Sequence, residues 1–243
     1  SLAWLRDGRR LASGAKDGTV LIWEPDRPLA SPASQLVPGE FAAWTFEGDR
    51  AQLLTLERDG TVGRWSGEEL RQFTPLGHGL TNLFFPRFSG SGRFLVGGIG
   101  GGGIRVWPVA QPTAAREFRV AEGPLTPVAF LPGSDRLIAR RWPQPEFQEW
   151  DCNTGQRLRT WRLAASPRLL AVRTVAVTGE WLAALNDDGA GQLLHLPTGR
   201  VTDLRLDLKQ ITAATLSPDG TLLAAVSRYG VGGLWEIPSA TCV

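Results

Sequence analysis

Methionine, cysteine and histidine are scarce in this sequence of 243 residues, which has no methionine, two cysteines and two histidines. Cys152 and Cys242 are far apart and form no CxxC pair, so the sequence predicts neither a disulfide framework nor a zinc site. His78 and His195 have no evident catalytic partner, although acid–base catalysis needs a positioned one. We therefore expect no catalytic residue, no metal and no cofactor, and a chain that is not an enzyme.

Long apolar runs are also missing. No stretch approaches the roughly 20 apolar residues that cross a bilayer, and the first residues do not form a charged-then-apolar signal segment. The low cysteine content fits a reducing compartment, so we expect a cytoplasmic protein without a membrane partner. Because the chain begins at Ser1 and lacks methionine, we expect it to be a piece of a longer protein with further domains.

Charge is nearly balanced overall but uneven along the chain. The formal net charge of +2 excludes a protein that coats nucleic acid wholesale, yet it allows a local basic patch. Residues 136–173 contain eight arginines against Glu146, Glu149 and Asp151. Two interpretations stay open: Arg157, Arg159 and Arg162 simply solvate an outer strand edge, or the arginines form a docking surface for an acidic partner.

A repeated pattern runs through the chain. The stretch LASGAKDGTVLIW, which ends at Trp23, returns as LLTLERDGTVGRW, which ends at Trp65, and then in looser forms. The anchors that end each pattern are Trp23, Trp65, Trp107, Trp150, Leu194 and Trp235, at steps of 42, 42, 43, 44 and 41 residues. A near-constant step of this length predicts a repeat architecture.

Each repeat is predicted to contain four short strands. The first strand has a small residue before a bulkier one, such as Ala43-Trp44. Two apolar strands joined by an Asp-Gly turn follow, and Asp-Gly between apolar runs is a strong hairpin signal. An alternating fourth strand follows, for example Leu158 to Trp161. Strands separated by turns every 8–12 residues or so indicate an all-β protein. No fourth strand is predicted after Trp235.

Four strands in each repeat of this length resemble the WD40 repeat family, whose units form β-propeller blades. The resemblance implies an all-β propeller of four-stranded antiparallel blades, and six repeats are visible, at approximately 1–38, 39–76, 77–122, 123–167, 168–208 and 209–243. We expect a single domain that is a fragment of a six- or seven-bladed ring. The residues that match the family's structural positions are Ser13, Asp17, Trp23, Asp59, Trp65, His78, Trp107, Trp150 and Trp235. The family's buried His–Ser/Thr–Asp–Trp network is incomplete in every repeat.

The resemblance implies a non-catalytic scaffold that binds a protein or peptide partner. In this family the partner commonly binds one face of the propeller. The turns between the second and third strands of each repeat form this face, together with the connections from each fourth strand to the first strand of the next repeat. By position, the candidate residues on the turns are Lys16, Arg58, Trp142, Asn186, Arg228 and Tyr229, and those on the connections are Glu40, His78 and Gln210. Arg140 and Arg141 lie near a turn. Arg87 replaces a small residue of a first strand, where it is predicted to face the channel and either narrow it or bind an anion there.

Other functions stay open at this point. The chain could be the substrate-recognition or catalytic propeller of a larger enzyme, or it could bind an anionic ligand or nucleic acid through the arginine-rich region. Nucleic acid is the less expected partner. The run Gly98 to Gly103 formally fits GxGxxG, but a strand follows it where the dinucleotide motif needs a helix, so it predicts a hairpin turn.

Overall fold

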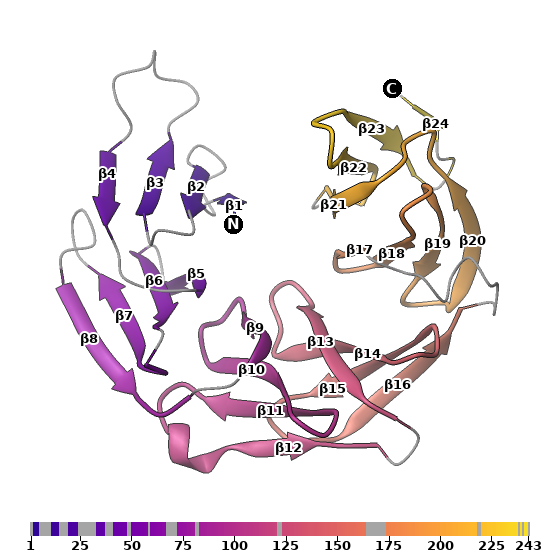
Figure 1. Ribbon diagram of the computed structural model, residues 1–243. Helices are drawn as coiled ribbons and strands as arrows, with labels where there is room; N and C mark the ends of the chain where they lie inside the picture. Colours follow the sequence, from indigo (N-terminus) through magenta and orange to yellow (C-terminus); the bar gives the residue numbers. More distant parts are fainter. Residues whose placement is uncertain are drawn as a thin grey trace. The chain divides into compact units, whose positions relative to one another are not determined.

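The computed structural model describes residues 2–4, 11–14, 19–23, 33–36, 41–47, 50–57, 59–66, 72–80, 83–120, 123–163, 174–217, 220–237, 239 and 241–242. Before residue 52 it describes the backbone alone. The strands form six sheets, each of four consecutive strands that pair antiparallel with their neighbours in sequence (Figure 1). The predicted all-β class with four-stranded antiparallel blades is thereby confirmed.

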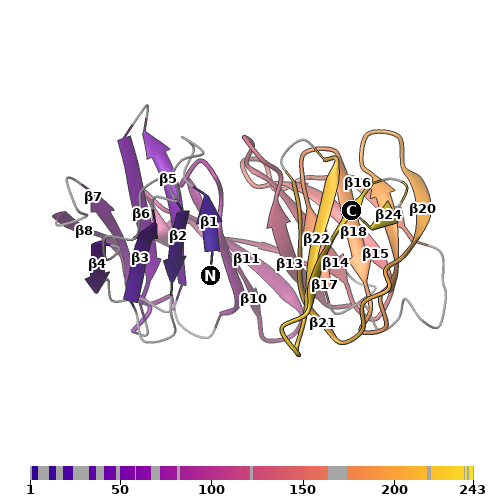
Figure 2. The ribbon, with the colours of Figure 1, turned by 90° about the horizontal axis from the view of Figure 1, so that it is seen from above.

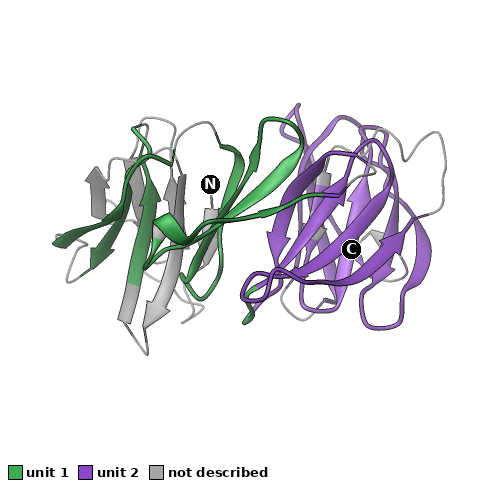
Figure 3. Cartoon of the chain, turned by 90° about the horizontal axis from the view of Figure 1, so that it is seen from below, with its two compact units in different colours: residues 1–119, 133–135 green, residues 120–132, 136–243 purple. Residues whose placement is uncertain are grey.

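The chain divides into two compact units, which we describe separately (Figure 3). Unit 1 contains residues 1–119 and 133–135, with three of the six sheets. Figure 2 shows the strands of its first sheet, β1 to β4, side by side. The strands of unit 1 are β1 (Leu2–Trp4), β2 (Leu11–Gly14), β3 (Thr19–Trp23), β4 (Ala33–Leu36), β5 (Phe41–Glu47), β6 (Arg50–Leu56), β7 (Val62–Ser66), β8 (Gln72–Gly77), β9 (Phe84–Phe88), β10 (Phe94–Ile99), β11 (Gly103–Pro108) and β12 (Arg116–Phe118).

Unit 2 contains residues 120–132 and 136–243, with the other three sheets. Its strands are β13 (Leu125–Phe130), β14 (Arg136–Arg141), β15 (Glu146–Asp151), β16 (Arg157–Arg162), β17 (Thr174–Val177), β18 (Trp181–Leu185), β19 (Ala190–His195), β20 (Arg200–Arg205), β21 (Ile211–Leu216), β22 (Leu222–Ser227), β23 (Gly232–Glu236) and β24 (Thr241–Cys242).

The last strand corrects one prediction. No fourth strand was expected after Trp235, yet β24 pairs with β23, with Cys242 opposite Trp235 and Thr241 opposite Glu236. A strand of two residues is too short to show the alternation on which that prediction relied. The sixth sheet therefore has four strands, as the other five do.

In the fourth sheet the two middle strands are buried on both faces, whereas the fourth strand is largely exposed. In β14 and β15 nine of the twelve residues are buried, which explains why these strands carry so few exposed positions. In β16 only Trp161 is buried, and the other five side chains, three of them arginines, are exposed. Strand β15 is buried although it contains Glu146, Gln148 and Glu149, so its sequence pattern alone does not report its depth.

Hydrophobic side chains pack between neighbouring sheets within each unit. In unit 1, Leu56 and Val62 of the second sheet pack with Leu95 and Trp107 of the third. In unit 2 one cluster joins the fourth and fifth sheets, and another joins the fifth and sixth through side chains such as Leu193 and Trp235. Packing of this kind joins the second sheet to the third in unit 1, and the fifth sheet to the fourth and the sixth in unit 2.

Helix is almost absent from the described residues. A single 3-10 turn, η2 (Pro112–Ala114), precedes β12. Along the part of the chain that the structure describes, we find no helix with the length and apolar content to cross a membrane.

Candidate interaction face

Two kinds of segment meet at one end of every four-stranded sheet. Because neighbouring strands are antiparallel, the turn between the second and third strands lies at the same end as the connection that leaves the fourth strand. We call these turns and connections the turn face of a unit. In unit 2 its described segments are 123–124, 142–145, 163, 186–189, 206–210 and 228–231, and in unit 1 they are 57, 59–61, 78–80, 83 and 100–102.

Trp142 begins the turn between β14 and β15 and is 46% exposed. Its backbone N–H donates to the carbonyl oxygen of Pro124, at 2.8 Å, in the connection that enters β13. The guanidinium of Arg140 lies over the indole ring, with its Cζ 4.7 Å from the centroid. A large aromatic side chain is therefore presented to solvent from a fixed backbone, and a cation supports one face of its ring.

Backbone hydrogen bonds tie three further segments of this face together. The N–H of Gln210 donates to the carbonyl oxygen of Asp187, at 2.6 Å, and its own carbonyl oxygen accepts from the N–H of Arg228, at 2.9 Å. Gln210 has a φ of 56°, a left-handed value that few non-glycine residues adopt. The connection between the fifth and sixth sheets thus bridges the turns of both sheets.

The fifth-sheet turn is held from within. Asn186 is only 4% exposed, and its Oδ1 accepts from the backbone N–H groups of Asp188 and Ala190, each at 3.0 Å. Gly189, with a φ of 77°, completes the turn, and its carbonyl oxygen accepts from the N–H of Leu206. Asn186 lies on the turn face as its position predicts, but its side chain is buried and holds the turn from inside; its role in binding a partner stays a prediction.

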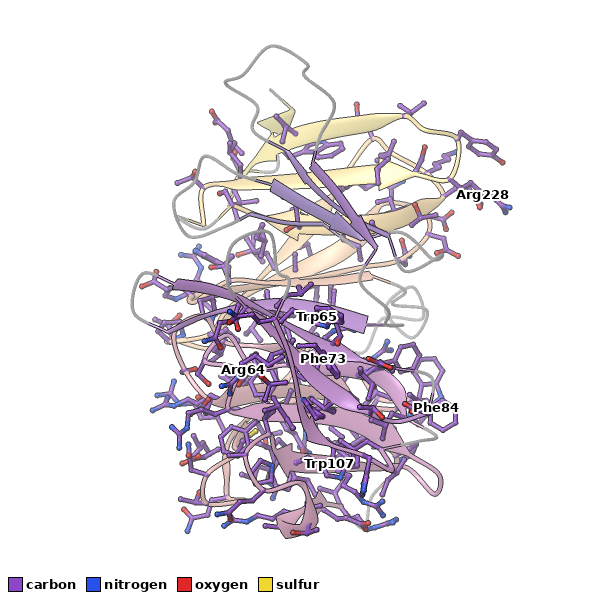
Figure 4. All side chains as sticks on the ribbon, turned by 90° about the vertical axis from the view of Figure 1, so that its left-hand side faces the viewer. Arg64, Trp65, Phe73, Phe84, Trp107 and Arg228 are labelled. Carbon is purple, nitrogen blue, oxygen red and sulfur yellow. The ribbon has the colours of Figure 1, made fainter. Side chains whose placement is uncertain are left out.

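The sixth-sheet turn presents two large side chains. Arg228 projects beyond the end of its sheet (Figure 4), and Tyr229 is 76% exposed. Ser227 Oγ accepts from the N–H groups of Tyr229 and Val231, at 3.3 and 3.2 Å, which fixes the backbone of the turn. Both exposed side chains, like Trp142, stand on turns that are held by hydrogen bonds.

The two arginines at the end of β14 differ in their surroundings. Arg141 is largely buried and its Nη2 lies 3.0 Å from Glu146 Oε2, so this charge belongs to an internal ion pair. Arg140 is also buried, and burial lowers the pKa of its guanidinium. Of the two, it is Arg140 that contacts the exposed aromatic side chain of the turn, Trp142.

Glu146 is the centre of a buried polar cluster that was not predicted from the sequence. Burial by itself would raise the pKa of this carboxyl, but hydrogen bonds from Arg162 and Gln148 and the charges of Arg141 and Arg162 outweigh burial and lower it. Gln148 also accepts from the indole N–H of Trp150, at 3.1 Å. The repeat tryptophan of this sheet is thus anchored by its own strand instead of by the family's histidine network.

The other repeat tryptophans find different partners. Trp65 Nε1 donates to Thr55 Oγ1, at 3.1 Å, and its ring lies beside Phe73 (Figure 4). Trp235 Nε1 donates to Asp207 Oδ1, at 3.2 Å, and Asp207 lies in the connection before β21. Thr55 precedes Trp65 at the same spacing as Ser13 precedes Trp23, so the repeat identifies it, whereas Asp207 lies in a connection that the repeat spacing does not identify. Trp107 is buried in the core of unit 1.

In unit 1 the turn after β6 is also fixed. Asp59 Oδ1 accepts from Thr61 N–H, at 2.8 Å, and this hydrogen bond is the main cause that lowers the pKa of the Asp59 carboxyl. Leu80 N–H donates to the carbonyl oxygen of Gly60, at 3.0 Å, so the connection after β8 is tied to this turn. His78 is exposed and therefore takes no part in a buried network.

Phe84 and Phe85, at the start of β9, were not identified from the sequence. Both are more than half exposed, and Phe85 has a left-handed φ of 53°. The register of β9 with β10 shifts beside them, so neither ring follows the inward–outward alternation of a regular strand. Arg87 lies in the same strand with an exposed side chain, and its Nη1 donates to the carbonyl oxygen of Pro86, at 3.0 Å. Its predicted role in a channel stays a prediction.

Several predicted residues lie outside the described residues or are described by backbone alone. Lys16, Asp17, Glu40 and Arg58 lie outside them, and Ser13 and Trp23 are placed only as backbone of β2 and β3. Among the described side chains, no group of three histidine, cysteine or acidic residues could hold a metal ion. His195 contacts Thr198 Oγ1 at 2.8 Å and stacks beside Trp181.

Similarity to known proteins agrees with this architecture. The family model described as WD domain, G-beta repeat (WD40) matches residues 1–24. The chain is similar to Periodic tryptophan protein 2 of Saccharomyces cerevisiae, with 22% identity over 256 residues that cover 100% of this chain and 25% of the relative. The chain thus spans a quarter of the length of that curated relative.

A solved structure has the same fold. A chain in the crystal structure of a mitotic checkpoint complex superposes with a TM-score of 0.66 and 14% identity, covering 97% of this chain and 73% of that chain. The identity is too low to carry a function across, but the TM-score shows a common architecture. The matched repeat, the relative and the shared fold together confirm the resemblance of this chain to the WD40-repeat β-propeller family.

Proposed function

We propose that the chain is a non-catalytic platform that binds a protein or peptide through its turn face. One observation carries the proposal: turns joined by backbone hydrogen bonds hold the exposed side chains of Trp142, Arg228 and Tyr229. Tryptophan, tyrosine and arginine are the side chains that most often dominate binding energy at protein interfaces. Presenting them from a fixed backbone reduces the conformational entropy that binding would otherwise cost.

The ionisable groups of the described chain support a binding role over a catalytic one. Glu146 and Glu149 are engaged with arginines, and Asp59 and Asp151 accept backbone N–H groups in their turns. His195 contacts Thr198 and Trp181, which are structural neighbours in its own sheet. Each of these groups has a local structural task, whereas catalysis needs an acid or base directed at a substrate.

The similar proteins also support a role in assembly. The structural neighbour is itself a chain of a mitotic checkpoint complex. We propose that the present chain likewise works within an assembly or beside further domains of a longer protein, in the cytoplasm. WD40 propellers typically bind other proteins, and experiment must identify the partner of this chain.

The proposal is tested by removing the three exposed side chains. A partner captured by the wild-type chain and identified by mass spectrometry is purified, and its Kd is measured for wild type and for the variant Trp142→Ala/Arg228→Ala/Tyr229→Ala. Because truncation of an anchor residue typically costs at least about 2 kcal/mol, we expect the variant to bind more than tenfold more weakly.

The matched control changes exposed residues at the opposite ends of the fourth and fifth sheets. The variant Gln156→Ala/Arg200→Ala alters the turn before β16 and the start of β20, which lie away from the turn face. Its affinity should equal that of wild type. Equal loss in both variants, or full binding by the triple variant, would contradict the proposed function.

A further inference from the structure

The fourth strand of the fourth sheet, β16, differs from the rest of unit 2 in charge and exposure. Its sequence is Arg-Leu-Arg-Thr-Trp-Arg, and every side chain except that of Trp161 is exposed. In the part of the chain that the structure describes, β16 pairs with β15 and with no other strand. Arginines on an edge strand commonly prevent unwanted pairing with other strands. The carboxylates near the arginines of β16 are buried, which leaves the positive charge exposed.

The acidic partners of these arginines lie underneath them. Glu146 and Glu149 of β15 have almost no exposed surface, whereas the side chain of Arg162 is 78% exposed and that of Arg159 is 53% exposed. Arg162 Nε lies 2.9 Å from Glu146 Oε2, and Arg159 Nε lies 3.8 Å from Glu149 Oε2. The negative charge is therefore inside and the positive charge outside.

Each buried carboxylate also serves a second arginine. Arg141 Nη2 lies 3.0 Å from Glu146 Oε2, and Arg136 Nη1 lies 3.0 Å from Glu149 Oε1. Glu146 and Glu149 lie on opposite faces of the sheet, because they are three residues apart in a regular strand, and each is shared by two guanidinium groups, so each face has one positive charge in excess. Arg157, also exposed, adds a further positive charge at the start of the strand. The strand edge consequently attracts anions.

The backbone of β16 offers a complementary set of hydrogen-bonding groups. Leu163 N–H donates to the Pro145 carbonyl oxygen, at 3.0 Å, one step beyond the pair Arg162–Glu146. In an antiparallel ladder hydrogen-bonded pairs alternate with non-bonded pairs. Trp161 therefore bonds inward to β15, whereas the N–H and C=O groups of Thr160 and Arg162 point outward from the sheet.

We propose that β16 binds an extended acidic peptide segment, which adds to the fourth sheet as a fifth strand. Strand addition supplies backbone hydrogen bonds, and the arginines supply specificity for carboxylates. A register shift separates the two arginines, because Arg157 is opposite Trp150 and Arg159 is opposite Glu149, so their side chains do not follow the regular alternation of a strand. Acidic side chains of the incoming strand would meet these arginines across the new strand pair. This surface is separate from the turn face.

The test uses a synthetic eight-residue peptide of alternating glutamate and valine, labelled for fluorescence anisotropy. A peptide with glutamine in place of glutamate, and a single-stranded oligonucleotide, serve as comparison ligands. We expect the glutamate peptide to bind at least tenfold more tightly than the glutamine peptide. The variant Arg157→Gln/Arg159→Gln should lose that preference.

Thr160→Pro separates strand addition from simple charge attraction. Proline removes the outward N–H of Thr160 while all the arginines and the ladder with β15 remain. We expect at least a tenfold loss of peptide affinity for Thr160→Pro and none for Thr160→Val, which keeps the N–H. Circular dichroism and thermal unfolding establish that both variants are folded.

Amide hydrogen exchange gives an independent readout that does not depend on a variant. On addition of the glutamate peptide, the amides of Thr160 and Arg162 should gain protection. The proposal is overturned if the glutamate peptide does not bind, if Thr160→Pro binds it as wild type does, or if these amides stay unprotected. Tighter binding of the oligonucleotide than of the peptide, unchanged in Thr160→Pro, would show a general polyanion surface and would equally overturn it.

Discussion

Glu146 illustrates at the scale of single residues how an incomplete family network is replaced. The carboxylate is buried, but Arg141, Arg162 and Gln148 surround it. The side-chain oxygen of Gln148 also accepts a hydrogen bond from the indole N–H of Trp150. Each of these side chains has a partner in the chain, and a buried polar network stabilises a fold only when its groups are paired. The tryptophan of this repeat is therefore fixed without a histidine.

The lowered pKa of Glu146 predicts how stability depends on pH. Because the folded state holds the carboxyl in its charged form, the unfolded state binds the proton more readily, and the stabilising contribution is complete well above pH 5. It is lost as the pH falls below the unfolded pKa of about 4.3 and through the lower folded value. Glu146→Gln should lower the free energy of unfolding at pH 7 by about 1–3 kcal/mol.

Urea unfolding at pH 7 and at successively lower pH measures this contribution. The difference between wild type and Glu146→Gln should shrink on acidification, because wild type loses the charge that the variant never had. An exposed carboxylate offers the control: Glu180→Gln should leave both stability and its pH dependence nearly unchanged. A constant difference between wild type and Glu146→Gln across the pH range would show that the charge of Glu146 does not stabilise the fold.

Turns are the elements that position the candidate face. The turn from Asn186 to Gly189 is held by a buried amide below and by the connection at Leu206 and Gln210 above. Gly189 has both a left-handed φ of 77° and no room for a side chain, since an added Cβ would lie 2.3 Å from the carbonyl oxygen of Leu208. Two independent constraints therefore require glycine there.

Gly189→Ala should destabilise the fold more than a left-handed backbone alone explains. A non-glycine residue in this region costs about 1–2 kcal/mol, and the Cβ also overlaps the backbone of the connection. We expect a loss of more than about 2 kcal/mol in chemical unfolding. Gly230→Ala, with the same φ of 77° but open space around its Cβ, is the matched control and should show the backbone cost alone. Equal losses in the two variants would argue against the tight contact.

The accuracy of prediction from sequence also varies among elements. Strands β14, β15 and β16 follow from the spacing of the repeat and from the arginine pattern of the fourth strand, although β15 is rich in polar residues that are nevertheless buried. β24 was missed because two residues carry no periodicity. The exposed pair Phe84–Phe85 was missed because a register shift, which no local residue type announces, turns both rings outward.

The candidate site was less predictable than the fold. Turn positions placed Trp142, Arg228 and Tyr229 on the turn face, where the structure exposes two aromatic rings and a guanidinium. Asn186 occupies an equivalent position, yet its side chain is buried, because an asparagine can bond its own turn instead of solvent. The bridging role of Gln210 depends on backbone geometry between two sheets, which sequence spacing does not contain.

At the scale of the whole molecule, six four-stranded sheets in two compact units provide rigid ends from which turns project. In the proposed function the sheets hold the turns in place, and the residues at the turns decide what is bound. The central claim is that a partner contacts the turn face and not the opposite ends of the sheets. The position of a bound partner on the chain therefore tests this claim.

Site-specific photo-crosslinking measures that location most directly. A photoreactive phenylalanine analogue is placed at Tyr229 on the turn face and, in a second protein, at Thr198 at the opposite end of the fifth sheet. The account predicts a covalent adduct with the partner from position 229 and none from position 198. An adduct from position 198 alone would show that the partner binds the other ends of the sheets and would contradict the central claim.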